Sequence, residues 1–326
     1  MLQATDRAVV ITGASSGVGL ATAHAFARRG ACVVLCARGE EPLDRAVREC
    51  RSLGGHAIGV PTDTRDPEAV KRLARMAAET FDGIGVWVNN AGVGAVGAFW
   101  EVPLEAHRAT IETDLMGYLH GAHAALPYFL SQGQGVLINN ISIGGLMPTP
   151  YAAAYAASKY AVRGFSDSLR QELHGWPDVH VCTVYPYFLD TPGVQHSANY
   201  TGRAMKPAPP VYRPEVVAET IVRLAHEPQR EVVVGLMAKL ARFEYALAPR
   251  LVEAAVARTT EFYLDHAAEA PVTDGNLLES VPGPMAVHGG WRKPAKRAAA
   301  VAALGVVAAG VLAASLPRDR ALPARR

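Results

Sequence analysis

The sequence predicts an α/β fold, because short apolar runs rich in β-branched residues alternate with helix-favouring stretches. The first run, residues 7–12, leads into a Gly-rich turn, and residues 20–29 then favour a helix. Glycines let the backbone approach phosphates, and a helix N-terminus offers free N–H groups, so this corner suits a dinucleotide. A plain tight turn is the alternative. The candidate contacts are Gly13, Ser15, Ser16, Gly17, Val18 and Gly19.

Length and composition favour one large domain with an appendage. The chain has 326 residues, half of them hydrophobic, and a formal net charge of +2. It can therefore bury a large core, and it lacks the basic balance typical of nucleic-acid binding. The charge is uneven, because residues 292–326 contain eight Lys or Arg and one Asp. We expect a domain of roughly 250 residues followed by a distinct tail.

The four cysteines and eleven histidines show no spacing typical of a disulfide framework or a metal site. His120 and His123 are three residues apart on an apolar helix, where packing is the expected role. No signal peptide precedes the first strand. We therefore expect reduced, buried thiols, no bound metal and a cytoplasmic protein.

Arg38 follows the second predicted strand, residues 30–37. A carboxylate at the end of this strand would hold an adenosine ribose 2′-hydroxyl, whereas an Arg binds a 2′-phosphate through two hydrogen bonds. The sequence therefore predicts NADP(H) in preference to NAD(H), which stays as the alternative. Arg38 could also be a solvated cation beside Glu40 and Glu41.

Two further strand ends add candidate cofactor contacts. Strand 56–60 is followed by Asp63 and Thr64, and Asp63 is placed either to accept from an adenine amino group or to cap the next helix. Strand 84–88 is followed by small residues that would let the backbone pass close to the cofactor ribose. These residues are Asn90, Ala91 and Gly92.

The candidate reactive residues lie between 142 and 159. Tyr155 and Lys159 are four apart in an Ala-rich helix, so they share one face, although an isolated pair of this kind is often only exposed. A nearby ammonium favours phenolate, which would bring the pKa of Tyr155 down from its ordinary value near 10 toward the range of a general acid/base. Ser142 follows the buried strand 136–141, at the sheet edge where ligands bind.

Four elements in this order resemble the short-chain dehydrogenase/reductase family over about residues 7–240. They are Thr12-Gly13-x-x-x-Gly17-x-Gly19, Asn89-Asn90-Ala91-Gly92, Ser142 and Tyr155-x-x-x-Lys159. The resemblance implies a Rossmann-like doubly wound parallel sheet of seven strands, a nicotinamide cofactor and hydride transfer between a carbonyl and an alcohol. It also implies that Tyr155 is the acid/base, that Lys159 lowers its pKa and holds the nicotinamide ribose, and that Ser142 orients the substrate oxygen.

Two positions depart from the pattern of this family. Its members commonly have N-x-x-G before the catalytic strand, where the Asn helps to fix a water that serves the catalytic Lys; this chain has Asp114-Leu-Met-Gly117. Asp114 can accept from such a water, but its charge would favour charged Lys159. Where the family usually has Pro-Gly after strand 179–185, this chain has Pro186-Tyr187. We therefore expect a bulkier side chain on the nicotinamide side of the pocket. Thr191 matches the family's Thr near the carboxamide and pyrophosphate.

A long Pro-rich loop, residues 187–214, is expected to close over the substrate, as the corresponding segment does in the family. Its aromatic residues and others nearby predict an apolar pocket without an Arg or Lys clamp for an acid. The wall candidates are Val93, Phe99, Trp100, Leu146, Met147, Tyr151, Tyr187, Phe188, Tyr200, Met205 and Tyr212. A lipophilic ketone or secondary alcohol is the predicted substrate; alternatively, about half of these aromatics only pack the loop.

Three parts are predicted along the chain: residues 1–240 as the Rossmann domain, 241–290 as a helical extension with a Pro/Gly-rich linker, and 291–326 as a basic tail. The tail includes residues 298–316, which carry no charge. As a helix this segment would span roughly 28 Å, close to a bilayer core of about 30 Å. A C-terminal membrane anchor or surface helix is one interpretation, and a soluble helix or disordered tail is the other.

The sequence thus predicts an NADP(H)-dependent oxidoreductase that acts on a small lipophilic carbonyl or alcohol, with Tyr155 as acid/base. The alternative is a low-turnover NADP(H)-binding sensor or scaffold, in which Asp114 and the Pro186-Tyr187 change have damped catalysis; a hydride-dependent epimerase is a lesser variant. The complete set of Ser142, Tyr155 and Lys159 favours the enzyme, because a binding protein needs no phenol with a lowered pKa. A homo-oligomer is implied only by family analogy.

Overall fold

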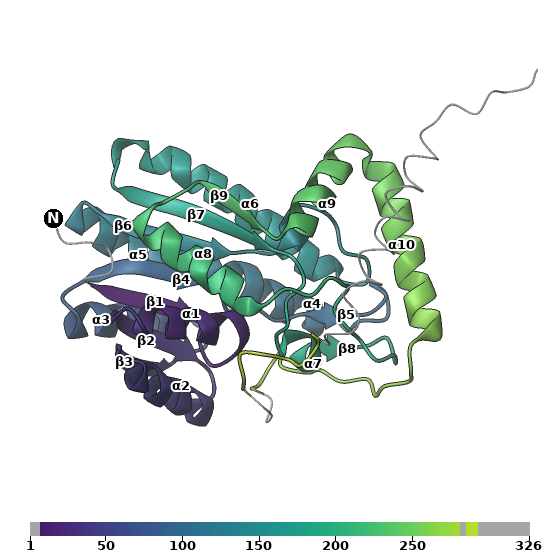
Figure 1. The fold of residues 1–326 in the computed structure, drawn as a ribbon, viewed down its shortest axis with the longest axis horizontal. Helices are drawn as coiled ribbons and strands as arrows, with labels where there is room; N and C mark the ends of the chain where they lie inside the picture. Colours follow the sequence, from purple (N-terminus) through teal and green to yellow (C-terminus); the bar gives the residue numbers. More distant parts are fainter. Residues whose placement is uncertain (1–6, 281–284, 293–326) are drawn as a thin grey trace, which may run out of the picture.

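A parallel sheet of seven strands forms the centre of the protein (Figure 1). The computed structural model describes residues 7–280 and 285–292. The strands of this sheet are β1 (Ala8–Thr12), β2 (Cys32–Ala37), β3 (His56–Pro61), β4 (Ile84–Asn89), β6 (Gly135–Asn140), β7 (Val179–Pro186) and β9 (Glu231–Val234). Their spatial order is β3-β2-β1-β4-β6-β7-β9, which confirms the doubly wound, Rossmann-like fold.

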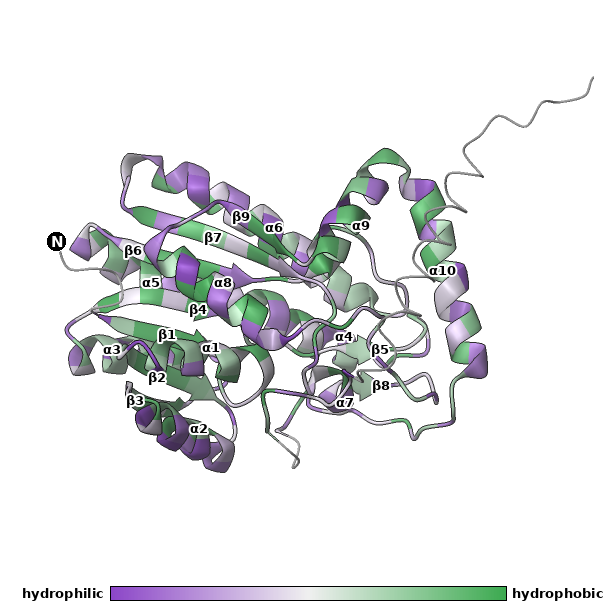
Figure 2. Cartoon of the chain, in the orientation of Figure 1, coloured by the Kyte–Doolittle hydropathy of each residue, from purple (hydrophilic) through white to green (hydrophobic). Residues whose placement is uncertain are grey.

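Helices connect the strands and cover both faces of the sheet. They are α1 (Gly17–Ala27), α2 (Glu40–Ser52), α3 (Pro67–Thr80), α4 (Leu104–Ile111), α5 (Gly117–Gln132), α6 (Ala153–Glu172) and α8 (Pro214–His226). Alternate strand residues point to opposite faces, so Val9 and Ile11 pack with α1, α2 and α8, whereas Val10 packs with α3 and α5. Figure 2 accordingly shows hydrophobic strands and a hydrophilic outer side of α2.

Short helical turns lie at two places that shape the site. The π-helical turn η2 (Glu112–Met116) joins α4 to α5, and the 3-10 turn η3 (Ile143–Gly145) follows β6. Another 3-10 turn, η4 (Leu173–Gly175), ends α6. A π-helical turn widens the backbone locally and is frequent at functional sites. Here η2 contains Asp114, whose side chain is fully buried.

The loop predicted over residues 187–214 contains short elements of its own. Helix α7 (Gly193–His196) precedes β8 (Ala198–Asn199), and β8 pairs in parallel with β5 (Ala95–Val96). This pairing fastens the loop to the segment that follows β4. Strands of two residues have no periodicity, so the sequence could not predict them.

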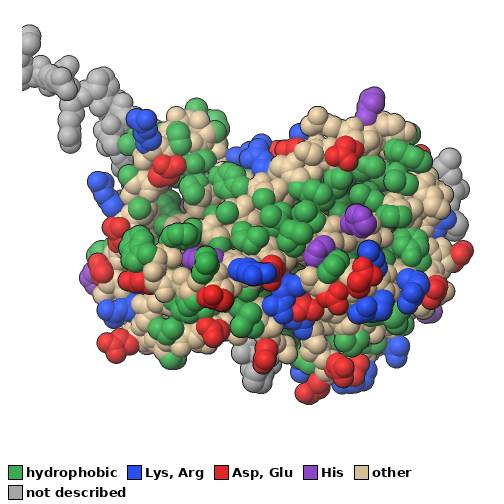
Figure 3. Space-filling model, turned by 180° about the vertical axis from the view of Figure 1, so that it is seen from behind, with side chains coloured by type: hydrophobic (Ala, Val, Ile, Leu, Met, Phe, Trp, Pro, Cys, Tyr) green, Lys and Arg blue, Asp and Glu red, His purple; other side chains and the backbone are tan. Residues whose placement is uncertain are grey.

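Two helices, α9 (Leu236–Leu247) and α10 (Pro249–His266), lie where the sequence predicted a helical extension from residue 241, and α9 begins before that residue. They are separate helices because Pro249 has no N–H with which to continue α9. Within residues 7–280 and 285–292, no helix is long and apolar enough to cross a membrane. The apolar segment 298–316 lies outside the described residues. Figure 3, from behind, shows hydrophobic side chains gathered over the centre of that face and charges of both signs interspersed along its lower right.

A chain of buried hydrogen bonds fixes α6 to the sheet. Trp87 Nε1 donates to Asn89 Oδ1, and Asn89 Nδ2 donates to Asn139 Oδ1, both at 2.9 Å. Asn139 Nδ2 then donates to Ser166 Oγ at 2.9 Å, and that hydroxyl donates to the Val162 carbonyl at 2.7 Å. Because these polar groups are partnered, the chain of bonds holds α6 in one place without leaving a buried donor unpaired.

We expect Ser166→Ala to lower the free energy of unfolding by about 1–3 kcal/mol, because Asn139 Nδ2 would stay buried without its acceptor. Ser168→Ala is the matched control, since Ser168 is exposed on the same helix, and it should change stability by less than about 0.5 kcal/mol. Urea unfolding of both variants measures the difference. Equal effects of the two substitutions would contradict the role given to Ser166.

Candidate active site

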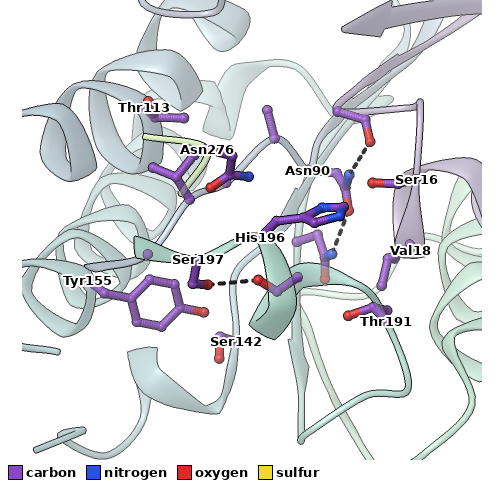
Figure 4. Close-up of a pocket in the computed structure, with 18 of the residues that line it drawn as sticks. Ser16, Val18, Asn90, Thr113, Ser142, Tyr155, Thr191, His196, Ser197 and Asn276 are labelled. Carbon is purple, nitrogen blue, oxygen red and sulfur yellow. Dashed lines mark hydrogen bonds between the residues drawn. The ribbon is translucent and has the colours of Figure 1, made fainter. Parts of the chain in front are cut away.

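A cleft of about 480 Å³ opens at the carboxyl edge of the sheet (Figure 4). It forms there because parallel strands all end at the same edge. The structure brings to it the predicted residues Gly13, Ser15, Ser16, Gly17, Val18, Arg38, Asp63, Thr64, Asn90, Ala91, Gly92, Ser142, Tyr155, Lys159, Pro186 and Thr191. Two predicted residues do not line the cleft, because Gly19 packs on Gly13 and Asp114 lies behind Lys159.

The Gly-rich turn has a shape that requires glycine. Gly13 and Gly17 have φ angles of 65° and 54°, in the left-handed region. A Cβ on Gly19 would lie 2.1 Å from the Gly13 carbonyl oxygen. Helix α1 begins at Gly17 and has no acidic residue in its first turn, so its N-terminus presents positive dipole charge to the cleft. This turn therefore fits the pyrophosphate of a dinucleotide.

Thr12 and Asn90 join the Gly-rich turn to the strand ends beside it. The Thr12 hydroxyl oxygen accepts from the N–H groups of Asn90 and Ala91 at 2.9 and 3.0 Å. Asn90 Nδ2 donates to the Thr12 carbonyl at 2.9 Å, and Asn90 Oδ1 accepts from Asn140 Nδ2 at 2.9 Å. The Asn90 side chain is thus a positioning group that holds the ends of β1, β4 and β6 together. Thr12 and Asn140 were not predicted as site residues.

Ser142 and Tyr155 lie close together on the opposite side of the cleft from Ser16 and Val18 (Figure 4). Ser142 Oγ accepts from the Gly144 N–H at 3.1 Å, which leaves the hydroxyl proton of Ser142 for another acceptor. A Cβ on Gly144 would lie 3.1 Å from Tyr155 Cε1 and 3.6 Å from Ser142 Oγ. Glycine at this position therefore leaves room for the two hydroxyl-bearing side chains.

Lys159 is buried in an ion pair. Its Nζ lies 2.9 Å from Asp114 Oδ2, and the two side chains are 3% and 0% exposed. Asp114 Oδ1 accepts from the Val93 N–H at 2.8 Å, which fixes the carboxylate. The ammonium also lies 4.7 Å from the centre of the Tyr118 ring and 5.3 Å from that of Tyr155. Lys159 is thus shared between a carboxylate and two aromatic rings.

This arrangement corrects the predicted pKa of Tyr155. Burial raises the pKa of Tyr155, Lys159 lowers it, the charge of Asp114 raises it again and Ser142 lowers it, and the net pKa lies above the ordinary value. Burial is the largest single effect and acts to lower the pKa of Lys159, but the charge of Asp114, the two tyrosines Tyr118 and Tyr155 and the hydrogen bond to Asp114 together outweigh burial, and the pKa is raised. The sequence predicted a lowered pKa for Tyr155 because the spacing showed Lys159 but neither the burial nor the proximity of Asp114.

Tyr118 is a site residue that the sequence analysis missed. Its side chain is 2% exposed, and its hydroxyl donates to the Asn140 carbonyl at 2.6 Å. Tyr118 lies four residues after Asp114, so the shared helix face was the signal that could have found it. Other lining residues that were not predicted include Thr113, Val194, His196, Ser197, Asn276, Ser280 and Met285.

At the end of the cleft beside β2 and β3, the predicted cofactor ligands already have partners. Arg38 donates to backbone carbonyls of residues 276–279 at 2.6–3.3 Å. Asp63 accepts from Arg65 through both carboxylate oxygens at 2.6–3.0 Å. Burial acts to raise the pKa of Asp63, but the hydrogen bonds from Arg65 together with the charges of Arg65 and Arg38 outweigh burial, and the pKa is lowered. Asp63 is therefore an ionised acceptor at the cleft edge.

The predicted apolar wall is only partly correct. Val93, Tyr187 and Phe188 line the cleft. Phe99 and Trp100 do not, since they are 60% and 84% exposed on the surface, and the other candidates also lie outside the lining. The apolar wall is formed instead by Ala95, Val96, Ile143, Ala152, Val194 and Pro207.

Cys36 lines the cleft at the end of β2, whereas the other three cysteines lie outside the lining. Cys50 and Cys182 are buried within the hydrophobic core, and none of the four cysteines forms a disulfide. Burial raises the pKa of Cys50 to about 12 and that of Cys182 to about 11. Among the described residues, no group of three His, Cys, Asp or Glu is placed to hold a metal ion.

The chain is similar to proteins that are named as oxidoreductases or dehydrogenases. A family profile described as short chain dehydrogenase matches residues 7–200. The uncharacterised oxidoreductase YxnA of Bacillus subtilis is 38% identical over 253 residues, covering 76% of this chain and 70% of that protein. The 1-deoxy-11-beta-hydroxypentalenate dehydrogenase of Streptomyces exfoliatus is 41% identical over 192 residues, covering 58% and 70%.

A solved structure shows the same fold. An alcohol dehydrogenase from the archaeon Thermococcus sibiricus, complexed with 5-hydroxy-NADP, matches with a TM-score of 0.62 and 27% identity, over 70% of this chain and 95% of that one. The family match spans more than half of the chain and includes the Gly-rich turn, Ser142, Tyr155 and Lys159. The chain therefore belongs to the short-chain dehydrogenase/reductase family, whose Rossmann-like fold binds NAD(P) and whose members are oxidoreductases.

Proposed function

We propose that the protein is an NADP(H)-dependent enzyme that interconverts a lipophilic ketone and its secondary alcohol, with Tyr155 as general acid/base. The observation that carries this proposal is the pairing of the Ser142 and Tyr155 side chains in an apolar part of the cleft, with the buried ammonium of Lys159 5.3 Å from the Tyr155 ring centre. Two hydroxyls side by side can both contact a single carbonyl oxygen, which is what proton transfer to that oxygen requires.

The reaction follows from the protons that these residues hold. The nicotinamide, when bound, supplies or takes up the hydride. In reduction, Tyr155 donates its phenolic proton to the substrate oxygen, and Ser142 donates a hydrogen bond to the same oxygen. In oxidation, the Tyr155 phenolate accepts the alcohol proton. Burial opposes the phenolate most strongly, Lys159 favours it and Asp114 opposes it, so burial and these two residues together set the working pH.

The charge of the cleft favours a neutral substrate. Among the described residues that line it, the Lys and Arg side chains are Arg38 at one end and Lys159, which is paired with Asp114. Burial lowers the pKa of His196, so this residue does not supply a permanent cation. The Streptomyces relative is named for 1-deoxy-11-beta-hydroxypentalenate, which supports an alcohol as the reacting group, although the same name denotes a carboxylate and so does not support a neutral substrate.

NADP(H) is proposed in preference to NAD(H) because of the residues that follow β2. Ala37 ends the strand without a carboxylate, and the guanidinium of Arg38 lies at the cleft edge. A guanidinium attracts a 2′-phosphate that a carboxylate would repel. The Thermococcus structure contains an NADP derivative, which supports the same choice.

A low-turnover NADP(H)-binding sensor is the second candidate function. The observation that favours it is the raised pKa of Tyr155, because a smaller fraction of the phenol is then ionised and able to act as a base. The completeness of the Ser142, Tyr155 and Lys159 set favours the enzyme. Turnover separates the two candidates.

Tyr155→Phe should lower kcat for reduction of a lipophilic ketone by about 10²–10⁴-fold, because the proton donor is removed. Its affinity for NADPH should stay within about twofold, since the change removes one hydroxyl and none of the phosphate contacts. Absorbance of reduced nicotinamide measures turnover over a panel of ketones and aldehydes, and fluorescence titration measures binding. Tyr160→Phe is the control, because Tyr160 is 37% exposed on the same helix. Equal loss in the two variants would contradict the assignment, and tight binding without turnover in the unaltered chain would support the sensor.

Asp114→Asn should shift the pH dependence of alcohol oxidation toward lower pH. The charge of Asp114 raises the pKa of Tyr155, so its removal lowers that pKa. Oxidation needs the phenolate, and its rate rises as pH increases through this pKa, so the rising limb moves to lower pH. Profiles of kcat against pH measure the shift. Glu112→Gln is the control on the same helical turn, and a shift to higher pH in Asp114→Asn would refute the argument.

Arg38→Leu should weaken NADPH binding by about 10- to 100-fold without weakening NADH binding, because hydrogen bonds to a charged group contribute about 1.5–3 kcal/mol. Fluorescence titration with the two nucleotides measures the difference. Arg48→Leu, an exposed Arg on α2, is the matched control and should leave both affinities unchanged. A parallel loss of NADH and NADPH affinity in Arg38→Leu would show that Arg38 does not read the 2′-phosphate.

A further inference from the structure

Two described stretches near the C-terminus, residues 276–280 and 285–291, lie against the cleft and are here called the C-terminal strap. After α10 the chain passes β8 and α7 and runs back toward α1 (Figure 1). The sequence predicted a Pro/Gly-rich linker at the end of residues 241–290, but Leu277 is 1% exposed and packs with Val93 and Val102. The Asn276 N–H donates to the His196 carbonyl at 2.8 Å. The strap is therefore anchored to the walls of the cleft.

Carbonyl groups of the strap accept hydrogen bonds from the guanidinium of Arg38. Arg38 Nη2 donates to the carbonyls of Asn276 at 2.6 Å and Glu279 at 3.3 Å. Nη1 donates to the carbonyls of Leu278 at 3.1 Å and Leu277 at 3.3 Å. A guanidinium has five N–H donors, and these four bonds leave only the one on Nε. A phosphate binds Arg through two parallel hydrogen bonds, so Arg38 cannot hold the strap and a 2′-phosphate at the same time.

The strap also contacts the Gly-rich turn. The Ala286 carbonyl accepts from the Gly17 N–H at 2.9 Å, at the first residue of α1. Free N–H groups at a helix N-terminus are the donors that a phosphate would use. The Met285 carbonyl accepts from Arg45 Nη2 at 3.3 Å. Backbone carbonyls of the strap thus stand at both places where the cleft offers donors to anions.

The far end of the strap holds the loop that covers the cleft. The Trp291 N–H donates to Asp190 Oδ1 at 2.7 Å, and the Trp291 indole donates to the Thr191 carbonyl at 3.0 Å. A Cβ on Gly289 would lie 2.3 Å from the Thr191 carbonyl oxygen, so the strap backbone lies directly on the loop. The strap therefore connects the β2 side of the cleft to the loop side.

We propose that the C-terminal strap is an internal competitor for the phosphates of the dinucleotide, and that NADP(H) binds through Arg38 only after the strap has left it. The inference rests on the proposed function, because it takes Arg38 as the 2′-phosphate ligand. Arg38 exchanges neutral carbonyl acceptors for a charged phosphate, which attracts the guanidinium more strongly than carbonyl dipoles do and matches its planar fork. NADP(H) therefore has a means of displacing the strap that NAD(H) lacks. Because NADP(H) needs Arg38 and NAD(H) does not, the closed strap lowers the affinity for NADP(H) more, and it thereby reduces the discrimination between the two cofactors.

The test removes the buried anchor of the strap. Leu277→Ser should raise NADPH affinity about tenfold or more and speed its association, because a closed strap lowers apparent affinity by the fraction of open molecules. The affinity for NADH should rise less, because NADH has no 2′-phosphate for Arg38 and gains only the Gly17 N–H that the Ala286 carbonyl had occupied. Leu278→Ser is the matched control, because Leu278 is 54% exposed and binds Arg38 only through its backbone. Stopped-flow nicotinamide fluorescence measures both nucleotides.

The outcomes separate this inference from the proposed function. If Leu277→Ser weakens NADPH binding, the strap closes over bound cofactor and the competitor proposal is overturned; an unchanged affinity overturns it as well. If NADPH and NADH bind equally in Leu277→Ser, with Arg38 released, then Arg38 does not recognise the 2′-phosphate, and the proposed cofactor preference fails instead.

Hydrogen exchange of the unaltered chain is a second measurement, and it does not depend on a variant folding correctly. Saturating NADPH should speed amide exchange in residues 276–280 and 285–291, because the strap leaves Arg38 and Gly17. NADH should have a smaller effect. Slower exchange throughout the strap in the presence of NADPH would overturn the proposal.

Discussion

The buried ion pair between Lys159 and Asp114 is the interaction on which the candidate active site depends. Removing one partner from a buried pair leaves an uncompensated charge and costs about 3–5 kcal/mol, so each residue fixes the other. Asp114 is held by the Val93 N–H and by the π-helical turn η2, whereas Lys159 comes from α6, the helix of Tyr155. The pair therefore sets both the position of α6 at the cleft and the electric field on the phenol.

The sheet provides the second constraint, because its parallel strands deliver every site segment to one edge. Thr12 and Asn90 hold three strand ends together at the cofactor side, and the buried bonds from Asn89 through Asn139 to Ser166 hold α6 at the other side. Both sets of hydrogen bonds join neighbouring strands of the sheet, and the second set also joins the sheet to α6. Small shifts within the sheet would therefore disturb the Gly-rich turn and Tyr155 together.

The sequence predicted the parts of this structure that depend on local pattern. Strands buried on both faces read as continuous apolar runs, and the Gly-rich turn and Tyr155-x-x-x-Lys159 are short enough to be recognised without a fold. The sign of the Tyr155 pKa shift was predicted wrongly, because it depends on burial and on the distance between Lys159 and Asp114. The strap was expected as a linker, since its contact with Arg38 joins residues 238 positions apart that no local pattern relates.

The strap and the ion pair act on different steps of one reaction. The strap competes at the β2 end of the cleft, where the charge of a phosphate decides the outcome, and no hydrogen bond or ion pair joins its described residues to Tyr155 or Lys159. The ion pair acts on a proton at the opposite end and makes no contact with Arg38. Changes in cofactor affinity and in the pH dependence of turnover should therefore be separable, with the first following the strap and the second following Asp114. A chain that controls the two independently can hold back cofactor binding without altering the chemistry that follows it.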